Sequence, residues 1–178
     1  MKVLITGANG LLGQKLVGLF VKERVDFIAT SKGPCRIDYL STPFEYQSLD
    51  ITNKDEVDRV ISTYKPDTVI HTAAMTNVDQ CENEQEACRL LNVDATANII
   101  AACEANGAYL VHLSTDFVFD GEDGPYKEED RPNPVNFYGQ SKLDAENLVM
   151  SSRCEWAIAR TVLVYGITPG MSRSNIIL

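Results

Sequence analysis

A tyrosine and a lysine stand four residues apart in the run NFYGQSK, residues 136–142. If this run is helical, Tyr138 and Lys142 lie one turn apart and their side chains share a face. A cation beside a phenol favours the phenolate, so we expect Lys142 to lower the pKa of Tyr138 from its usual value of about 10. The pair would then act as a general acid/base near neutral pH. The spacing alone is weak evidence, because it also arises by chance at the polar start of a surface helix.

Hydroxyl and carboxyl groups follow an apolar run upstream of this pair. The run AYLVHLS, residues 108–114, has the pattern of a buried strand, and Thr115 and Asp116 come directly after it. Ligands of open parallel sheets bind at the carboxyl ends of the strands, so Ser114 and Thr115 are expected to face a cleft. We therefore assign Thr115 and Asp116 to the substrate side, with the Thr115 hydroxyl holding a substrate oxygen.

Glycines recur at every third position in the run TGANGLLG. The apolar run KVLIT, residues 2–6, reads as a strand, and LLGQKLVGLFVK, residues 11–22, reads as an amphipathic helix. Gly7 permits a sharp turn, Gly10 lets backbone N–H groups approach a pyrophosphate, and Gly13 lets helix and strand pack closely. The helix N-terminus adds a dipole that favours an anion. This context predicts a dinucleotide site rather than a plain structural turn.

The end of the second expected strand, VDFIAT at residues 25–30, bears on the choice of cofactor. An acidic residue at this place often binds the ribose 2′-hydroxyl of NAD. Here the chain continues with Ser31 and Lys32, and Arg36 lies beyond. A hydroxyl and cations suit a 2′-phosphate, so we expect NADP(H), with NAD(H) as the alternative. Lys32 and Arg36 are otherwise ordinary solvated loop charges.

Strand-like and helical runs alternate along the rest of the chain. Thr52 and Asp55 fit a capping box at the start of one helix, a long helix is expected at residues 84–105, and Asn106 with Gly107 is a stop signal. The further expected strands are FEYQSL, DTVIHTAA, WAIAR and VLVYG. On the first helix the expected apolar face carries Leu12, Leu16, Leu19 and Phe20. This order predicts a doubly wound α/β fold of the Rossmann type, with helices on both faces of a parallel sheet.

Composition and charge exclude several classes of protein. A net charge of -9 argues against a nucleic-acid surface, and the apolar runs are shorter than the ~18 residues that span a bilayer. The five cysteines are odd in number and lack metal-ligand spacing, so we expect reduced thiols, no metal site and a cytoplasmic protein. His71 and His112 lie within strand-like runs and are expected in the core. Residues 1–178 should form one NAD(P)-binding domain that ends at SNIIL, with the smaller substrate lobe largely absent.

Taken together, these motifs resemble the extended short-chain dehydrogenase/reductases. The run STDFVFDG, followed by PYKEEDRPNPVNFYGQSKLDAE, is similar to the dTDP-4-dehydrorhamnose reductase family, and the resemblance covers nearly the whole chain. It implies that Thr115, Tyr138 and Lys142 form a catalytic triad. The cofactor contacts expected from the motifs and the resemblance are Gly7, Gly10, Leu11, Leu12, Gly13, Ser31, Lys32, Asp50, Ile51, Ala73, Ala74, Tyr138 and Lys142.

The resemblance also implies an activity, which is the NADPH-dependent reduction of a 4-keto-6-deoxy sugar nucleotide by a chain that can pair as a homodimer. Tyr138 would supply the proton to the keto oxygen and Lys142 would bind the nicotinamide ribose. Met75 and Leu163 depart from the family pattern near the substrate side and leave the sugar open. Two alternatives stand beside this one: an epimerase or dehydratase of the same superfamily, and a non-catalytic subunit like the beta subunit of methionine adenosyltransferase.

Overall fold

The computed structural model describes residues 1–169 of the 178-residue chain, so the run SNIIL lies outside the described part. Its strands form one sheet in the order β3-β2-β1-β4-β5-β6, and every pairing is parallel. This confirms the expected doubly wound fold. The strands are β1 (Lys2–Thr6), β2 (Asp26–Ser31), β3 (Glu45–Ser48), β4 (Thr68–His71), β5 (Tyr109–Thr115) and β6 (Trp156–Thr161).

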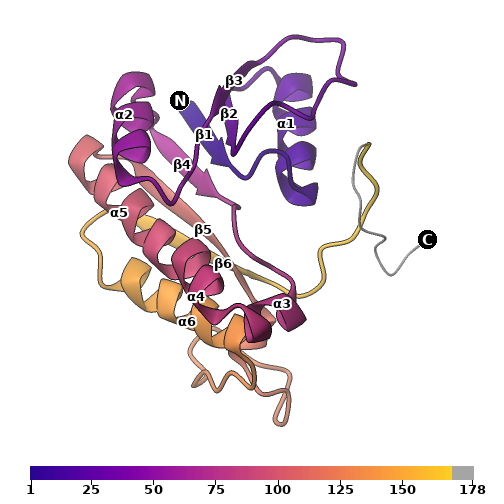
Figure 1. Ribbon diagram of the computed structural model, residues 1–178, viewed down its shortest axis with the longest axis vertical. Coiled ribbons are helices and arrows are strands. Elements are labelled where there is room, and N and C mark those ends of the chain that lie inside the picture. Colours follow the sequence, from indigo (N-terminus) through magenta and orange to yellow (C-terminus); the bar gives the residue numbers. More distant parts are fainter. Residues whose placement is uncertain (170–178) are drawn as a thin grey trace.

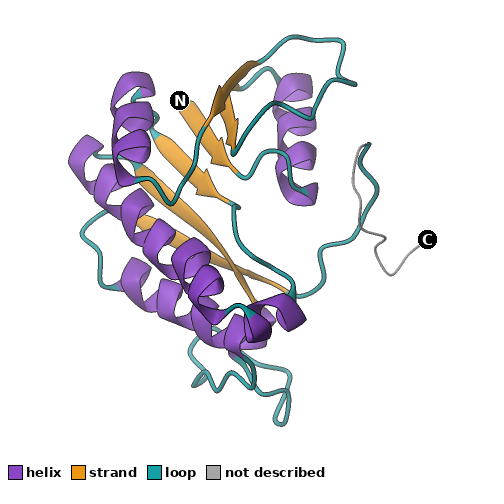
Figure 2. Ribbon diagram, in the orientation of Figure 1, coloured by secondary structure: helices purple, strands orange, loops and turns teal. Residues whose placement is uncertain are grey.

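Helices cover both faces of this sheet (Figure 1). They are α1 (Leu11–Glu23), α2 (Lys54–Tyr64), α3 (Val78–Asn83), α4 (Gln85–Arg89), the π-helical turn η1 (Leu90–Asp94), α5 (Ala95–Asn106), the 3₁₀ turn η2 (Asp116–Val118) and α6 (Phe137–Met150). Figure 2 shows α1 on one side of the sheet, with α2, α5 and α6 on the other. None of the helices in the described part is long and apolar enough to cross a membrane.

Strand β1 is apolar on both of its faces, at Val3, Leu4 and Ile5. Successive side chains of a strand point to opposite faces, and here both faces are covered. Val3 and Ile5 pack with Val17 of α1, whereas Leu4 belongs to the larger core that α2, α5 and α6 share. Burying a side chain of this kind contributes about 1.5–3 kcal/mol, so both faces of β1 are strongly specified.

Two helix boundaries differ from the expected ones. Helix α2 is capped by Asn53, whose side chain accepts a hydrogen bond from the Glu56 N–H group, one residue later than the capping box expected from Thr52 and Asp55. The Thr52 side chain is engaged elsewhere, since its Oγ1 donates to Asp50 Oδ1 at 2.7 Å. The expected single helix at residues 84–105 is divided by the π-helical turn, and α3 precedes it.

The run VLVYG is not a strand. It follows β6 as an irregular segment in which Val162 is 76% and Tyr165 63% exposed. The segment runs from the carboxyl end of β6 toward α1 (Figure 1), where Lys15 Nζ donates to the Ile167 carbonyl oxygen at 2.6 Å. Apolar composition alone therefore misassigned it, because it forms no pairing with the sheet.

Candidate active site

The glycine turn between β1 and α1 brings three backbone segments into contact. Gly7 has a φ of +69°, and a Cβ atom there would lie 2.7 Å from the Ala73 nitrogen after β4. A Cβ at Gly13 would lie only 2.3 Å from the Gly7 carbonyl oxygen. Glycine is thus required at both positions, because the left-handed backbone and the close approach exclude a side chain. The result is an α1 N-terminus held directly against the carboxyl edge of the sheet.

The N-terminus of α1 has the properties of an anion site. Its N-cap residue is Gly10, which has no side chain to occupy the free N–H groups, and its first turn carries no acidic residue. Those N–H groups and the helix dipole favour a pyrophosphate. Helix α1 and the glycine turn therefore fit the central part of a dinucleotide.

Two adjoining hollows extend from this turn along the carboxyl edge. The smaller, of about 250 Å³, is lined by the glycine turn and by Ser31, Lys32, Asp50, Ile51 and Ala73, among others. The larger, of about 480 Å³, is lined by the same turn and by Thr115, Tyr138 and Lys142, among others. Both hollows share Gly7, Gly10, Thr72 and Ala74. The structure thus brings together every expected cofactor residue, Leu11, Leu12 and Gly13 included.

In the smaller hollow, an ion pair joins two of the expected cofactor residues. Lys32 Nζ lies 2.6 Å from Asp50 Oδ2. Burial raises the pKa of Asp50, but hydrogen bonds from Lys32 and Thr52 outweigh it and the net pKa is lowered. Asn9 fixes the loop beyond Lys32, since its side chain donates to the Pro34 carbonyl and accepts from the Arg36 N–H group. Asn9 was not anticipated from the sequence.

In the larger hollow, the small size of Gly139 allows the start of α6, with Tyr138, to lie close to the end of β5, with Thr115. Asn136 caps α6 by accepting a hydrogen bond from the Gly139 N–H group at 2.8 Å. A Cβ atom at Gly139 would lie 2.2 Å from the Phe117 carbonyl oxygen, so α6 begins against the backbone that follows β5. This close approach places Tyr138 on the same side as Thr115, and both residues line the larger hollow.

The expected low pKa of Tyr138 is wrong for this structure. Tyr138 is 8% exposed, and burial raises the pKa of its phenol, with a smaller lowering by the neighbouring Thr115 hydroxyl. The ammonium of Lys142 points to a different partner, since its Nζ lies 3.2 Å from His112 Nε2. Tyr138 therefore keeps its proton at neutral pH.

Lys142 is itself buried, with 3% of its surface exposed. Burial lowers its pKa to about 8, and Glu146 one turn further along α6 opposes this shift. Glu146 is fully buried and accepts two hydrogen bonds from Arg160 of β6, at 3.0 and 2.7 Å. Lys142 thus stays mainly charged at pH 7.

Asp116 takes a different position from the one expected. It lines neither hollow and accepts a hydrogen bond from Thr115 Oγ1 at 3.1 Å. Leu163 does line the larger hollow, whereas Met75 packs against a cluster of Cys81, Cys88 and Tyr138. Of the two departures from the family pattern, Leu163 is therefore the one that faces the hollow.

Sequence reasoning missed the contribution of the π-helical turn. Asn92 of this turn accepts a hydrogen bond from the Met75 N–H group at 2.8 Å and donates to Ser141 Oγ at 2.9 Å. Ser141 in turn donates to the Tyr138 carbonyl at 2.7 Å. The available signal in the sequence was an asparagine within the apolar run LLNV, residues 90–93. Ser114 Oγ, buried in the lining of the larger hollow, has no partner among the described residues.

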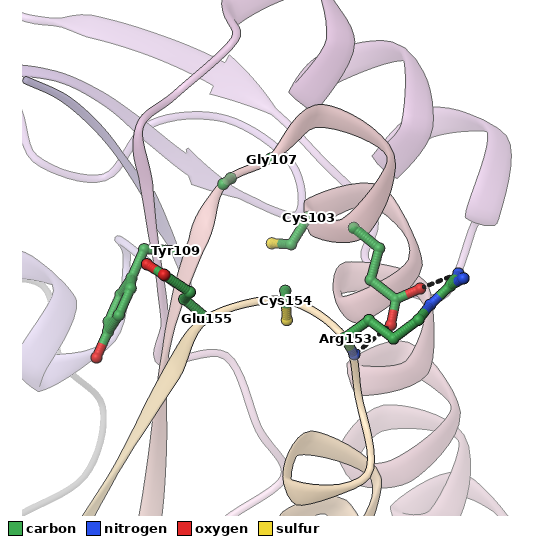
Figure 3. Close-up of a pocket in the computed structure, with 8 residues that line it drawn as sticks. Cys103, Gly107, Tyr109, Arg153, Cys154 and Glu155 are labelled. Carbon is green, nitrogen blue, oxygen red and sulfur yellow. Dashed lines mark hydrogen bonds and ion pairs between the residues drawn. The ribbon is translucent and has the colours of Figure 1, made fainter.

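A further hollow of about 430 Å³ opens at the opposite, amino-terminal edge of β5 and β6 (Figure 3). Its lining includes Cys103, Cys154 and Tyr109, and the cation Arg153 is paired with Glu104 at 2.9 Å. This hollow lies away from the glycine turn. Among the described residues no group of three or more His, Cys, Asp or Glu side chains could hold a metal ion.

Known proteins resemble this chain over nearly its full length. A family model described as the RmlD substrate binding domain matches residues 1–176. Methionine adenosyltransferase 2 subunit beta from Bos taurus is 33% identical over 175 residues, which are 98% of this chain and 50% of that protein. A dTDP-4-dehydrorhamnose reductase from Aggregatibacter actinomycetemcomitans is 36% identical over 167 residues, which are 93% of this chain and 52% of that protein.

Solved structures agree with the sequence comparisons. The dTDP-4-dehydrorhamnose reductase of Bacillus anthracis in complex with NADP superposes with a TM-score of 0.80 at 36% identity, covering 94% of this chain and 55% of that one. The chain thus spans about half the length of the relatives it matches. It belongs to the RmlD substrate binding domain family, within the extended short-chain dehydrogenase/reductases.

Proposed function

We propose that this protein is an NADPH-dependent reductase of a 4-keto-6-deoxy sugar nucleotide. The observation that carries the proposal is the convergence of Thr115, Tyr138 and Lys142 on one hollow that continues into the glycine turn. A reductase of this kind needs a dinucleotide beside a proton donor. These residues supply the donor at the place where the turn would present the nicotinamide.

The protonated phenol of Tyr138 suits reduction. When bound, NADPH supplies a hydride to the keto carbon, and the Tyr138 O–H group donates its proton to the keto oxygen. Because burial keeps the pKa of Tyr138 above its usual value, the acid form is the one present before reaction. The Thr115 hydroxyl, which donates to Asp116 in this structure, turns to donate a hydrogen bond to the same oxygen as negative charge develops there.

We assign Lys142 to the nicotinamide ribose and Ser31 and Lys32 to the ribose 2′-phosphate. A cation that is 77% exposed, like the Lys32 side chain, can leave its ion pair with Asp50 at little cost and meet a phosphate. We expect Lys32→Ala to weaken NADPH binding about tenfold, or about 1.4 kcal/mol, and to leave NADH binding unchanged. Lys54→Ala is the matched control, since Lys54 is an exposed lysine paired with Asp58 on α2. A clear preference of the wild type for NADH would end the assignment to NADP(H).

A second candidate is a non-catalytic NADP-binding subunit, and the observation that favours it is the 33% identity with methionine adenosyltransferase 2 subunit beta. An epimerase or dehydratase of the same superfamily would use the cofactor without net consumption. These candidates differ in what happens to NADPH.

The deciding experiment follows NADPH in the presence of 4-keto-6-deoxy sugar nucleotides of differing base and sugar. We expect the full-length protein to oxidise one NADPH for each keto group reduced, and Tyr138→Phe to abolish this turnover while NADPH still binds. Isomerised or dehydrated product without NADPH loss would identify an epimerase or dehydratase. Cofactor binding with no turnover, together with a stable protein partner, would identify the subunit.

A further inference from the structure

A row of buried polar side chains without a role in the proposed reaction extends across β4 and β5 to Lys142 of α6, which lines the larger hollow. Its central members are His71 and His112, which face each other in adjacent strands with ring centroids 5.5 Å apart. Both side chains are at most 2% exposed. Buried polar groups need hydrogen-bond partners, so the neighbours of each ring show which of its nitrogens donates and which accepts.

His71 has a partner for each nitrogen. Its Nδ1 lies 2.7 Å from Thr6 Oγ1, and its Nε2 lies 3.2 Å from Thr96 Oγ1. The Thr96 hydroxyl already donates to the Asn92 carbonyl at 2.7 Å, so its oxygen accepts from His71 Nε2–H. His71 is therefore a neutral, fully paired core residue, consistent with a pKa that burial lowers to about 3.

His112 differs because one of its nitrogens meets Lys142. The Lys142 Nζ atom lies 3.2 Å from His112 Nε2, and His112 Nδ1 has no partner among the described residues. An ammonium only donates hydrogen bonds, so Nε2 must be the unprotonated nitrogen of a neutral ring. Burial, and then the charge of Lys142, hold the pKa of His112 well below its usual value.

We propose that His112 is a positioning residue for Lys142, holding its ammonium at the carboxyl edge of β5 by accepting a hydrogen bond at Nε2. The inference rests on the proposed function, in which Lys142 binds the nicotinamide ribose. Packing in the core does not by itself require this contact. His71 occupies the equivalent place in the adjacent strand and is hydrogen-bonded to Thr6 and Thr96 instead of Lys142.

The charges around Lys142 explain why a positioning group is needed. The ionisable groups that face it are Glu146 and Tyr138 on α6, Cys88 on α4 and the two strand histidines. Glu146 attracts the ammonium along α6, one turn away from Tyr138. His112 on β5 offers an acceptor on the sheet side instead. Without it, we expect the ammonium to turn toward Glu146 and away from the hollow.

Two substitutions at this position separate positioning from packing. His112→Leu replaces the imidazole by an apolar side chain of similar size and so removes the acceptor, whereas His112→Gln places an amide oxygen near the position of Nε2. His71→Gln is the matched control, because it changes the neighbouring buried histidine and leaves the contact with Lys142 intact. The free energy of unfolding of each variant is measured alongside, so that loss of fold is seen directly.

The first readout is NADPH affinity of the full-length protein between pH 6 and 9, which needs no sugar nucleotide. We expect His112→Leu to weaken NADPH binding on the order of tenfold at pH 7 and to change its pH dependence. We expect His112→Gln to restore binding to within about twofold, and His71→Gln to leave the pH dependence as in the wild type. Binding by His112→Leu that equals the wild type across this range would overturn the proposal.

The second readout is turnover of the keto sugar nucleotide. We expect His112→Leu to lower kcat by 10- to 100-fold, on the order expected for a misplaced group, with the KM for the sugar nucleotide nearly unchanged. If His112→Leu and His112→Gln lowered kcat equally, with equal losses in the free energy of unfolding, His112 would act only as a core residue and the proposal would be wrong. If the NADPH results are as expected and no keto sugar is turned over, the positioning role stands and the proposed reductase activity fails.

Discussion

Two glycine-to-alanine substitutions on α1 test the close approach that builds the cofactor site. Both Gly13→Ala and Gly18→Ala replace a helical glycine, so both gain about 1 kcal/mol of helix propensity. They differ in their surroundings. A Cβ atom at Gly13 would lie 2.3 Å from the Gly7 oxygen and 2.6 Å from the Ala8 Cα atom, whereas a Cβ at Gly18 meets nothing within 4 Å.

The magnitude follows from that difference. Ordinary contact begins near 3.4 Å, so the Gly13 variant must open a gap of about 1 Å between two backbone segments that have no flexible side chain to move aside. Overpacking of this kind costs about 3 kcal/mol, which leaves Gly13→Ala about 2 kcal/mol less stable than the wild type and Gly18→Ala about 1 kcal/mol more stable. The predicted gap between the two variants is about 3 kcal/mol, or roughly 6–12 °C in Tm.

Urea denaturation with a common m-value measures this gap, and NADPH titration of the same two variants measures its effect on the site. Because the shift moves the α1 N-terminus away from the sheet edge, Gly13→Ala should also lose cofactor affinity while Gly18→Ala keeps it. Equal stabilities of the two variants, within about 0.5 kcal/mol, would refute the claim that α1 is packed to backbone contact at Gly13.

Further predictions concern the buried charges beneath the site. The pKa of Lys142 is lowered from 10.5 to about 8, so its charge destabilises the folded state fully below pH 8 and progressively less between pH 8 and 10.5. Lys142→Met should therefore be about 3 kcal/mol more stable than the wild type at pH 7. Denaturation at a series of pH values should show this gain shrinking above pH 8. Arg160→Met leaves the fully buried Glu146 unpaired and should cost about 3–5 kcal/mol in the same assay, while an unchanged stability would mean that Glu146 takes up a proton instead. The pKa values of His71 and His112 are lowered in the folded state, so the unfolded chain takes up protons first as the pH falls and the free energy of unfolding should drop below pH 6.5. His71→Gln should reduce the slope of the free energy of unfolding against pH, between pH 6.5 and 4.5, by about 1.4 kcal/mol per pH unit.

Sequence patterns predicted the fold where one local rule decided the outcome. The run KVLIT had to be buried on both faces, and Gly7 and Gly13 had to be glycines for α1 to begin against it. Patterns failed where tertiary packing decided. Leu19 belongs to the apolar periodicity of α1 but is 49% exposed, because the buried face is centred on Gly13, Gln14 and Val17.

The site followed the same division. Spacing placed Tyr138 and Lys142 on one helix, but it did not show that burial would outweigh the lysine in setting the pKa of the tyrosine. Lys142 contacts His112 instead, which lies 30 positions away in sequence. The packing of α6 against β5 brings the two residues together. Such contacts depend on the packing of whole elements, which no local pattern encodes.

The central claim is that the hollow beside Tyr138 transfers a hydride from a dinucleotide at the glycine turn to a keto carbon. The most direct measurement supplies NADPH that carries deuterium at the transferable C4 position of the nicotinamide, together with a 4-keto-6-deoxy sugar nucleotide. We predict one deuterium on C4 of the product sugar with the wild-type protein, and none with Tyr138→Phe. Product that forms without deuterium, or NADPH that binds and is never oxidised, would contradict the account.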